Sequence, residues 1–457
     1  MGNAVREAVM VQPKDAESSL EFLRWFDRYS KQYELADRVR DSLEKDRTRL
    51  ELRSVKLSSS DFKLLAEMEP LAEIKHLSLS NTNMDDAGLE ALGACPFLSR
   101  LKSLNISANN VGDDGLFLLA RSPVFSNLME LDASENEIGA IGCKALGTSL
   151  TLKNLRHLNL SHNRLESFGV NAFANTEFMK NLESLKLADT VMEDSGFFSL
   201  VDSTNILKLK KLDLSSNGIT ARGMESLSKS GEFQRLQSLR LDDNRIGDEG
   251  LLALASNSTL TNLEELYLKC CELTADGAMA LSKSELRLKT LAVFNNDLRG
   301  EGVRALGEMK SPYNLTTLDL GENRLGPEGA QALAECPAFA NLKTLHLSNN
   351  HIGDEGAIAL ARSKKLTQLE ILHLDCDNWI HAQGAQAIAE SDALSSLKTL
   401  ILTLNRIGDE GAQYLAQSSK LSNLVSLNVA GNGLSPLGDS ALGESQALAN
   451  LKVLEIV

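Results

Sequence analysis

Apolar and polar residues alternate in short stretches that recur along most of the chain. In residues 342–350, for example, Leu345 and Leu347 alternate with Thr344, His346 and Ser348. A period of two residues is typical of a strand with one buried face, because successive side chains of a strand point to opposite sides. Each such stretch therefore predicts a short strand.

A helical pattern follows each predicted strand. In residues 353–363, Ala357, Leu360 and Ala361 recur at the spacing of one helix face. Asp354 and Glu355 precede them, where a helix N-terminus favours negative charge. The two patterns together predict a unit of one strand and one helix.

This unit repeats along about nine tenths of the sequence. The first apolar position of each repeat recurs every 27 residues, with one step of 25 and one of 28, at Ile74, Leu101, Leu128, Leu155, Leu182, Leu209, Leu236, Leu263, Leu288, Leu315, Leu342, Leu369, Leu397, Leu424 and Leu451. A degenerate earlier copy is expected at Leu52, Val55 and Leu57. One unit is too small to bury its own apolar face, so neighbouring units must stack into a continuous core with parallel strands. We therefore predict a solenoid of about 15 repeats over residues 51–457, after a separate segment at 1–50.

Asparagine dominates the ninth position of the repeat. Ten repeats carry it, as Asn109, Asn136, Asn163, Asn217, Asn244, Asn296, Asn323, Asn350, Asn405 and Asn432, whereas four others carry Thr82, Thr190, Cys271 and Asp377. An asparagine side chain donates and accepts hydrogen bonds at once. Placed where the strand turns inward, it can satisfy backbone groups of adjacent turns. We predict a structural ladder, with a loss of about 1–3 kcal/mol for each rung removed.

The motif L-x-x-L-x-L-x-x-N-x-I-G-D-E-G-A-x-A-L-A is matched best at 236–255, 342–361 and 397–416. It resembles the leucine-rich repeat family, and most of all the ribonuclease-inhibitor-like branch as found in bacterial multi-repeat proteins. The resemblance implies an α/β leucine-rich repeat solenoid, a curved horseshoe with a parallel β-sheet on the concave face and α-helices on the convex face. It also implies that a protein partner binds on the concave face and the loop edges, and that Cys271 can serve as a rung.

Composition narrows the choice of partners. The net charge of −15 and the pI of about 5.1 disfavour nucleic acid or an anionic membrane as the main partner. No apolar run reaches the roughly 18 residues of a membrane span, and the N-terminus lacks a secretory pattern. The six cysteines are scattered without a C-x-x-C pair, which is typical of reduced thiols in a cytoplasmic protein. Non-classical secretion stays open.

Both ends of the chain differ from the regular repeat. Apolar residues at steps of three or four, from Leu20 to Leu43, predict an amphipathic helix of about 30 residues. Two interpretations stay open for it: a cap over the first repeat, or a surface for dimerisation or partner binding. The C-terminal strand of Leu454, Ile456 and Val457 is expected to have an open edge, which is a second candidate for self-association.

Candidate binding residues lie where the repeat pattern does not dictate the residue. On each strand these are the third, fifth and seventh positions, which share the concave side. Two clusters there carry aromatic, basic or bulky residues of the kind found in binding hot spots. The first, which we name the aromatic–basic patch, comprises Arg240, Glu265, Tyr267, Lys269 and Phe294. The second, the histidine patch, comprises His346, Ile371, His373, Asp375, Trp379, Ile401 and Leu404.

Trp379 belongs to the 28-residue repeat. The extra residue is expected before Gly384, which places Trp379 in an inserted loop above a rung where Asp377 replaces asparagine. A tryptophan on an insertion favours recognition of a partner. It can equally cover a packing gap, and both interpretations stay open.

The residues contain no nucleophile, P-loop or zinc-protease motif, so we predict no catalytic residue and no cofactor. Asp319, His346 and His373 align on adjacent strands, but strand neighbours are not preset for tetrahedral ligation, and no metal is predicted. The favoured function is a non-catalytic scaffold or inhibitor that binds a protein. The alternatives are a GTPase-activating-type regulator, with Arg164, Arg245 or Arg406 as candidate arginines, and a host-targeting bacterial effector.

Overall fold

A computed structural model describes residues 34–310 and 314–456. The chain divides into two compact units, Met1–Asn159 and Leu160–Val457. The units are described separately below, and part of the predicted N-terminal helix, from Leu20 to Tyr33, lies outside the described residues.

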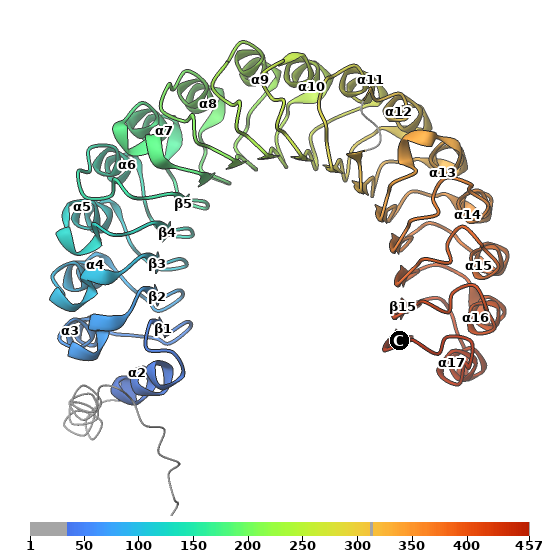
Figure 1. The fold of residues 1–457 in the computed structure, drawn as a ribbon, viewed down its shortest axis with the longest axis horizontal. Helices are drawn as coiled ribbons and strands as arrows, with labels where there is room; N and C mark the ends of the chain where they lie inside the picture. Colours follow the sequence, from blue (N-terminus) through green and yellow to red (C-terminus); the bar gives the residue numbers. More distant parts are fainter. Residues whose placement is uncertain (1–33, 311–313, 457) are drawn as a thin grey trace, which may run out of the picture. The chain divides into compact units, whose positions relative to one another are not determined.

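The first unit consists of short parallel strands that alternate with helices (Figure 1). Its described elements are α2 (Glu34–Lys45), β1 (Arg49–Glu51), α3 (Ser59–Ala66), η1 (Glu69–Glu73), β2 (His76–Ser78), α4 (Asp86–Gly93), η2 (Pro96–Arg100), β3 (Ser103–Asn105), α5 (Asp113–Arg121), η3 (Pro123–Phe125), β4 (Glu130–Asp132), α6 (Ala140–Gly147) and β5 (His157–Asn159). Each strand pairs with the next one along the chain.

The second unit continues the same alternation. Its first half contains α7 (Glu166–Ala174), η4 (Glu177–Asn181), β6 (Ser184–Lys186), α8 (Glu193–Val201), β7 (Lys211–Asp213), α9 (Ala221–Ser228), β8 (Ser238–Arg240), α10 (Gly247–Ser256), β9 (Glu265–Tyr267), α11 (Ala275–Ser282) and β10 (Thr290–Ala292). Its second half contains α12 (Arg299–Leu306), β11 (Thr317–Asp319), α13 (Gly326–Glu335), η6 (Pro337–Phe339), β12 (Thr344–His346), α14 (Gly353–Ala361), β13 (Ile371–His373), α15 (Ala382–Ala389), β14 (Thr399–Ile401), α16 (Gly408–Ala416), β15 (Ser426–Asn428), α17 (Pro436–Gly443) and β16 (Val453–Glu455). Within this unit the strands line the inner side and the helices the outer side (Figure 1).

Parallel register places equivalent residues side by side. Leu345 of β12 lies beside Leu372 of β13, and His346 lies beside His373. Both leucines are fully buried, because the middle residue of each strand points into the core between the sheet and the helices. The predicted α/β solenoid of alternating strands and helices is confirmed.

The first repeat has a different register from the one predicted. Leu50 of β1 lies beside Leu77 of β2, so Leu50 and Leu52 occupy the positions predicted for Val55 and Leu57. The prediction was five residues out of register, because the first position of this repeat is the polar Arg47 and the apolar pattern offers no start. The repeats therefore begin with β1 at Arg49.

The described part of the N-terminal helix packs against this first repeat. In α2, Leu35, Ala36, Val39 and Leu43 are all buried, with exposures of at most 5%, and the helix contacts β1. Its apolar side therefore faces the core of the first unit.

Carboxylates at helix starts connect each repeat to the next. Asp354, in the first turn of α14, accepts hydrogen bonds from the backbone N–H groups of His381 (2.7 Å) and Gly384 (2.9 Å) at the start of α15. A Cβ at Gly384 would lie only 2.6 Å from Asp354 Oδ1, which explains the glycine. Equivalent bonds are made by Asp86, Asp113, Asp194, Asp248 and Asp409. These aspartates therefore cap the N-terminus of the helix in the next repeat. Their negative charge also interacts favourably with the dipole of the helix on which they lie.

Candidate functional site

The aromatic–basic patch is assembled by β8, β9 and β10. Strand register places Arg240 beside Tyr267, and the guanidinium carbon lies 4.0 Å from the centroid of the tyrosine ring. Lys269 Nζ lies 5.5 Å from the centroid of the Phe294 ring. Glu265 is the half-buried first residue of β9. The structure thus brings the five predicted residues together on neighbouring strands, with two of them as cations held over aromatic rings. A cation–π contact of this kind contributes about 0.5–1 kcal/mol at an exposed site.

A buried carboxylate beneath this patch was missed in the sequence. Asp242 is 8% exposed, accepts the backbone N–H of Lys269 at 2.8 Å and pairs with Arg240 Nη1 at 3.0 Å. Burial raises the pKa of Asp242, while the Lys269 N–H and Arg240 oppose that shift. Asp242 is at the seventh position of its repeat, which the sequence already predicted to face inward. An acidic residue at such a position, two residues after Arg240, was the signal that could have added it to the patch.

The phenol of Tyr267 is held in its protonated form. Burial, followed by the nearby Glu265, raises the pKa of Tyr267. The patch therefore offers a neutral hydroxyl group, which can donate as well as accept a hydrogen bond, beside the fixed charge of Arg240.

The histidine patch is centred on two stacked imidazoles. The ring centroids of His346 and His373 are 4.1 Å apart, and both residues are half-buried at the ends of adjacent strands. His373 Nδ1 lies 3.8 Å from Asp375 Oδ1, which in turn accepts a hydrogen bond from Ser348 at 2.9 Å. Burial and then His346 lower the pKa of His373, while Asp375 and Asp319 oppose this shift.

We expect the folded protein to lose stability in mild acid because of His373. Its pKa is lowered in the folded state, so the unfolded chain takes up this proton first as the pH falls below about 6.5. Stability from this residue is therefore present above the unfolded pKa and is lost between that value and the lower folded pKa. Urea midpoints at pH 7.5 and pH 5.5 should differ less in His373→Gln than in the wild type. The control is His157→Gln, which replaces an exposed histidine of the first unit and should leave the difference between the two urea midpoints unchanged. If His373→Gln and His157→Gln show the same difference, a group other than His373 causes the acid sensitivity.

Two apolar members of the histidine patch lie on the same strands as this pair or next to it. Ile401 lies beside His373 in the sheet, and Ile371 opens β13. Leu404 is 59% exposed and lies close against Gly431, where a Cβ would be 2.7 Å from Leu404 Cδ2. The patch is thus polar at its centre and apolar toward β14.

The predicted surroundings of Trp379 are wrong. The rung of this repeat is Asn378: its Oδ1 accepts from the backbone N–H of Asn350 at 3.0 Å, and its Nδ2 donates to the Leu347 carbonyl at 2.8 Å. The extra residue falls before the rung, where Cys376 and Asp377 both have positive φ, because the strand end can bulge there without shifting the ladder. Trp379 therefore has the regular position after a rung, where it is 48% exposed and its ring centroid lies 4.5 Å from that of His351.

The asparagines at the ninth position bind backbone groups rather than facing the surface. Asn350 Nδ2 donates to the carbonyls of Leu320 and Ser348, and its Oδ1 accepts from Asn323 and Leu325. Similar bonds are made by Asn109, Asn136, Asn163, Asn217, Asn244, Asn296, Asn323, Asn405 and Asn432. Thr82, Thr190 and Cys271 take the place of asparagine at the ninth position of their repeats, and each donates a hydrogen bond to a backbone carbonyl.

Two of the candidate arginines lie close to carboxylates of their own surface. Arg164 and Arg245 are exposed and lie 3.9 Å from Glu166 and Glu272 respectively. Among the described residues, no three His, Cys, Asp or Glu side chains are grouped as a metal site requires. All six cysteines are free. Within residues 34–310 and 314–456, no helix has the length and apolar character needed to cross a membrane.

Comparison with known proteins identifies the repeats. A family model described as leucine-rich repeat matches residues 74–93, 99–120, 206–228, 234–255, 259–282, 288–307, 314–334, 340–361 and 393–416, and a second one matches residues 154–176. The chain is a leucine-rich repeat protein with many repeats. No curated protein matches this leucine-rich repeat protein.

Two solved structures are similar to this chain at low sequence identity. The yeast structure of Rad7 in complex with Elc1 is 18% identical, with a TM-score of 0.52, over 97% of this chain and 98% of the other. An internalin (inlF) from Listeria monocytogenes is also 18% identical, with a TM-score of 0.46, over 87% of this chain and 94% of the other.

Proposed function

We propose that this leucine-rich repeat protein is a non-catalytic scaffold or inhibitor that binds a protein partner on the strand side of its second unit. The observation that carries the proposal is the aromatic–basic patch, in which Arg240 and Lys269 are already stacked over Tyr267 and Phe294. Tyrosine and arginine are enriched in hot spots, and side chains held in place before binding lose less conformational entropy when a partner arrives. The strands supply a rigid base for them.

The histidine patch extends this surface along β12–β14. Trp379 and Leu404 are about half exposed, although large apolar side chains are mostly buried in this fold. Exposed apolar groups beside polar ones are typical of interaction sites. The yeast relative in fold is itself described in a complex, of Rad7 with Elc1, which is in keeping with partner binding by such a solenoid.

We also propose that the repeats belong to the ribonuclease-inhibitor-like branch and that the protein works in the cytoplasm. In support of the branch, each complete repeat of the second unit contains an α-helix of eight to ten residues. In support of the compartment, the six cysteines are all free thiols, as is usual in reducing surroundings. The segment predicted at 1–50, now taken to end before β1, is proposed as a cap, since α2 buries its apolar side on the first repeat.

Affinity capture from lysate of the source cells tests the binding surface. The tagged full chain is compared with Tyr267→Ala/Phe294→Ala and with Ile371→Ala/Trp379→Ala, and bound proteins are identified by mass spectrometry. A partner captured by the wild type should be reduced about tenfold or more in both variants, because each loses two central contacts.

The matched control is Phe168→Ala/Leu252→Ala, which removes two exposed apolar side chains from α7 and α10 on the helix side of the same unit. Circular dichroism verifies that all variants are folded. A partner that is retained by both patch variants but lost from the control would move the binding surface to the helix side and overturn the proposal.

A further inference from the structure

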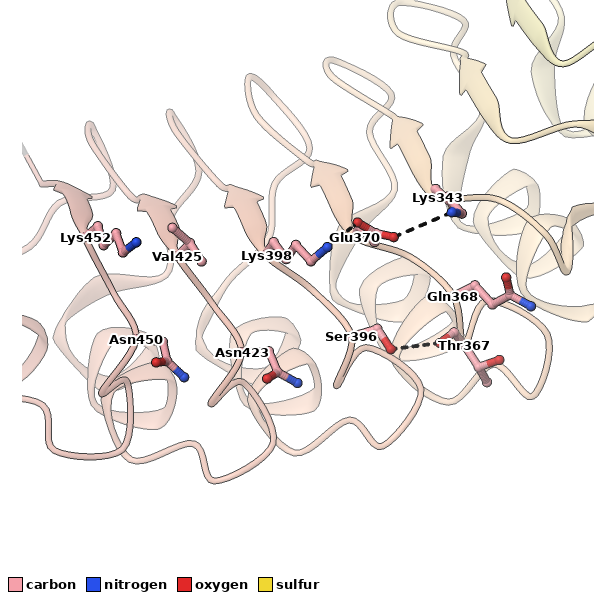
Figure 2. Close-up of a pocket in the computed structure, with 10 residues that line it drawn as sticks. All are labelled: Lys343, Thr367, Gln368, Glu370, Ser396, Lys398, Asn423, Val425, Asn450 and Lys452. Carbon is pink, nitrogen blue, oxygen red and sulfur yellow. Dashed lines mark hydrogen bonds and ion pairs between the residues drawn. The ribbon is translucent and has the colours of Figure 1, made fainter.

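A hollow of about 680 Å³ lies at the edge of the second unit where strands β12–β16 begin. Its upper wall is formed by residues that directly precede the strands, among them Lys343, Lys398 and Lys452, and its lower wall by residues of the preceding loops, among them Asn423 and Asn450 (Figure 2). These residues belong to neither patch. The hollow is therefore a surface distinct from the one in the proposed function.

The lysines form a row with regular spacing. Lys343, Lys398 and Lys452 occupy the second position of alternate repeats, directly before β12, β14 and β16. Parallel strands lie about 4.8 Å apart, so alternate strands are separated by about 9.6 Å. The row presents a positive charge at each such step, in a chain whose net charge is −15.

One carboxylate holds part of this row in place. Glu370 lies between Lys343 and Lys398, with Nζ–Oε distances of 3.9 Å and 2.6 Å. Lys398 lowers the pKa of Glu370, which therefore stays ionised at neutral pH. Among the residues that the structure describes, the Lys452 ammonium has no ion-pair partner. Three cations facing one anion leave an excess of positive charge along the hollow.

The lower wall offers hydrogen-bond acceptors. The side-chain Nδ2 atoms of Asn423 and Asn450 donate to the carbonyls of Ser395 and Ser422, at 3.0 Å and 2.8 Å, which fixes both amides. Within the described part of the chain, neither side-chain oxygen accepts a hydrogen bond. Both are therefore open to N–H groups of a bound peptide backbone.

We propose that this hollow binds an acidic peptide segment of a partner in the extended polyproline II conformation. That helix has three residues per turn and rises about 3.1 Å per residue, so every third side chain points the same way at intervals of about 9.3 Å. This interval matches the spacing of alternate strands, which lets carboxylates at every third residue meet the three lysines. The backbone of such a peptide makes no internal hydrogen bonds and has its N–H groups free for the asparagine oxygens.

Fluorescence anisotropy with defined peptides tests the proposal on the full chain. The probe is labelled Glu-Ala-Pro-Glu-Ala-Pro-Glu, with Gln-Ala-Pro-Gln-Ala-Pro-Gln as the uncharged control and Glu-Glu-Glu-Ala-Pro-Ala-Pro as the control for spacing; the alanines keep backbone N–H groups that proline would lack. We expect the first peptide to bind most tightly and its affinity to fall as salt is raised, because exposed charges are screened. Equal affinity for the two acidic peptides would contradict the proposal that carboxylates at every third residue match the spacing of the lysines.

Charge reversal places the binding in the hollow. Lys343→Glu/Lys452→Glu should weaken the first peptide about tenfold or more. The matched control is Lys75→Glu/Lys102→Glu, which reverses two exposed lysines at the same repeat position in the first unit and should leave the affinity unchanged. Unaltered binding by the folded hollow variant, or no saturable binding by the wild type, would overturn the proposal. So would tighter binding of a single-stranded DNA oligonucleotide, which would assign the row to nucleic acid.

Discussion

Asn378→Ala is expected to lower the free energy of unfolding by about 3 kcal/mol, because removal of a buried partner leaves backbone groups without hydrogen bonds at about 1–3 kcal/mol each. Asn378 is fully buried. Its amide serves the N–H of Asn350 and the carbonyl of Leu347 in the preceding repeat, and the carbonyl of Asp375 in its own. Urea unfolding followed by circular dichroism measures the loss.

The neighbouring Asp377→Asn is the matched control. Asp377 is exposed and has a φ of 41°, a conformation that asparagine accepts readily. We expect this variant to stay within about 0.5 kcal/mol of the wild type, as is usual for surface substitutions. A large loss in Asp377→Asn with a small one in Asn378→Ala would show that Asp377 is the rung after all.

Asp354→Ala is expected to cost about 2 kcal/mol, since hydrogen bonds to a charged group are worth about 1.5–3 kcal/mol and the loss of a helix cap about 1 kcal/mol. The carboxylate accepts two N–H groups of α15, a helix of the next repeat. The variant leaves both donors at the start of that helix without their partner. Equilibrium unfolding in urea again gives the measurement.

Glu355→Ala separates this capping from the helix dipole. Glu355 is also in the first turn of α14, but its side chain is exposed. Its loss removes the same charge from the same helix end, at about 0.3–1 kcal/mol. Similar losses in the two variants would contradict the capping role and leave the dipole as the explanation.

The alternation of leucines with polar residues was enough to predict the strands from β2 onward, because a period of two and a spacing of 27 residues reinforce each other in nearly every repeat. The same reasoning failed at the first repeat, where Arg47 replaces the leading leucine. It failed again at the 28-residue repeat. Counting from Leu369 reaches Asp377, and only the hydrogen bonds of the folded chain show that the backbone bulges at Cys376 and Asp377 so that Asn378 fills the rung.

The candidate site was predictable in part for a related reason. Inward-facing positions can be found from strand period alone, so the members of both patches other than Leu404 and Trp379 were identified before their contacts were known. Asp242 was missed because its inward position and nearby Arg240 were the signals in the sequence, whereas the Lys269 N–H that helps to compensate its buried charge is visible only in the folded chain. The lysine row was missed because its position in the repeat was taken for part of the frame. The lysines can be recognised as a candidate binding surface only when the hollow that five successive repeats form together is seen.

The bonds of the asparagines and aspartates run from each repeat to equivalent backbone groups of its neighbour, such as from the N–H of Asn323 to Asn350 and from the N–H of His381 to Asp354. A gene duplication or deletion of one whole repeat would therefore leave every remaining bond with an equivalent partner. A loss of any other length would break the bonds at the junction. The array can thus change its length during evolution in whole repeats without loss of these bonds.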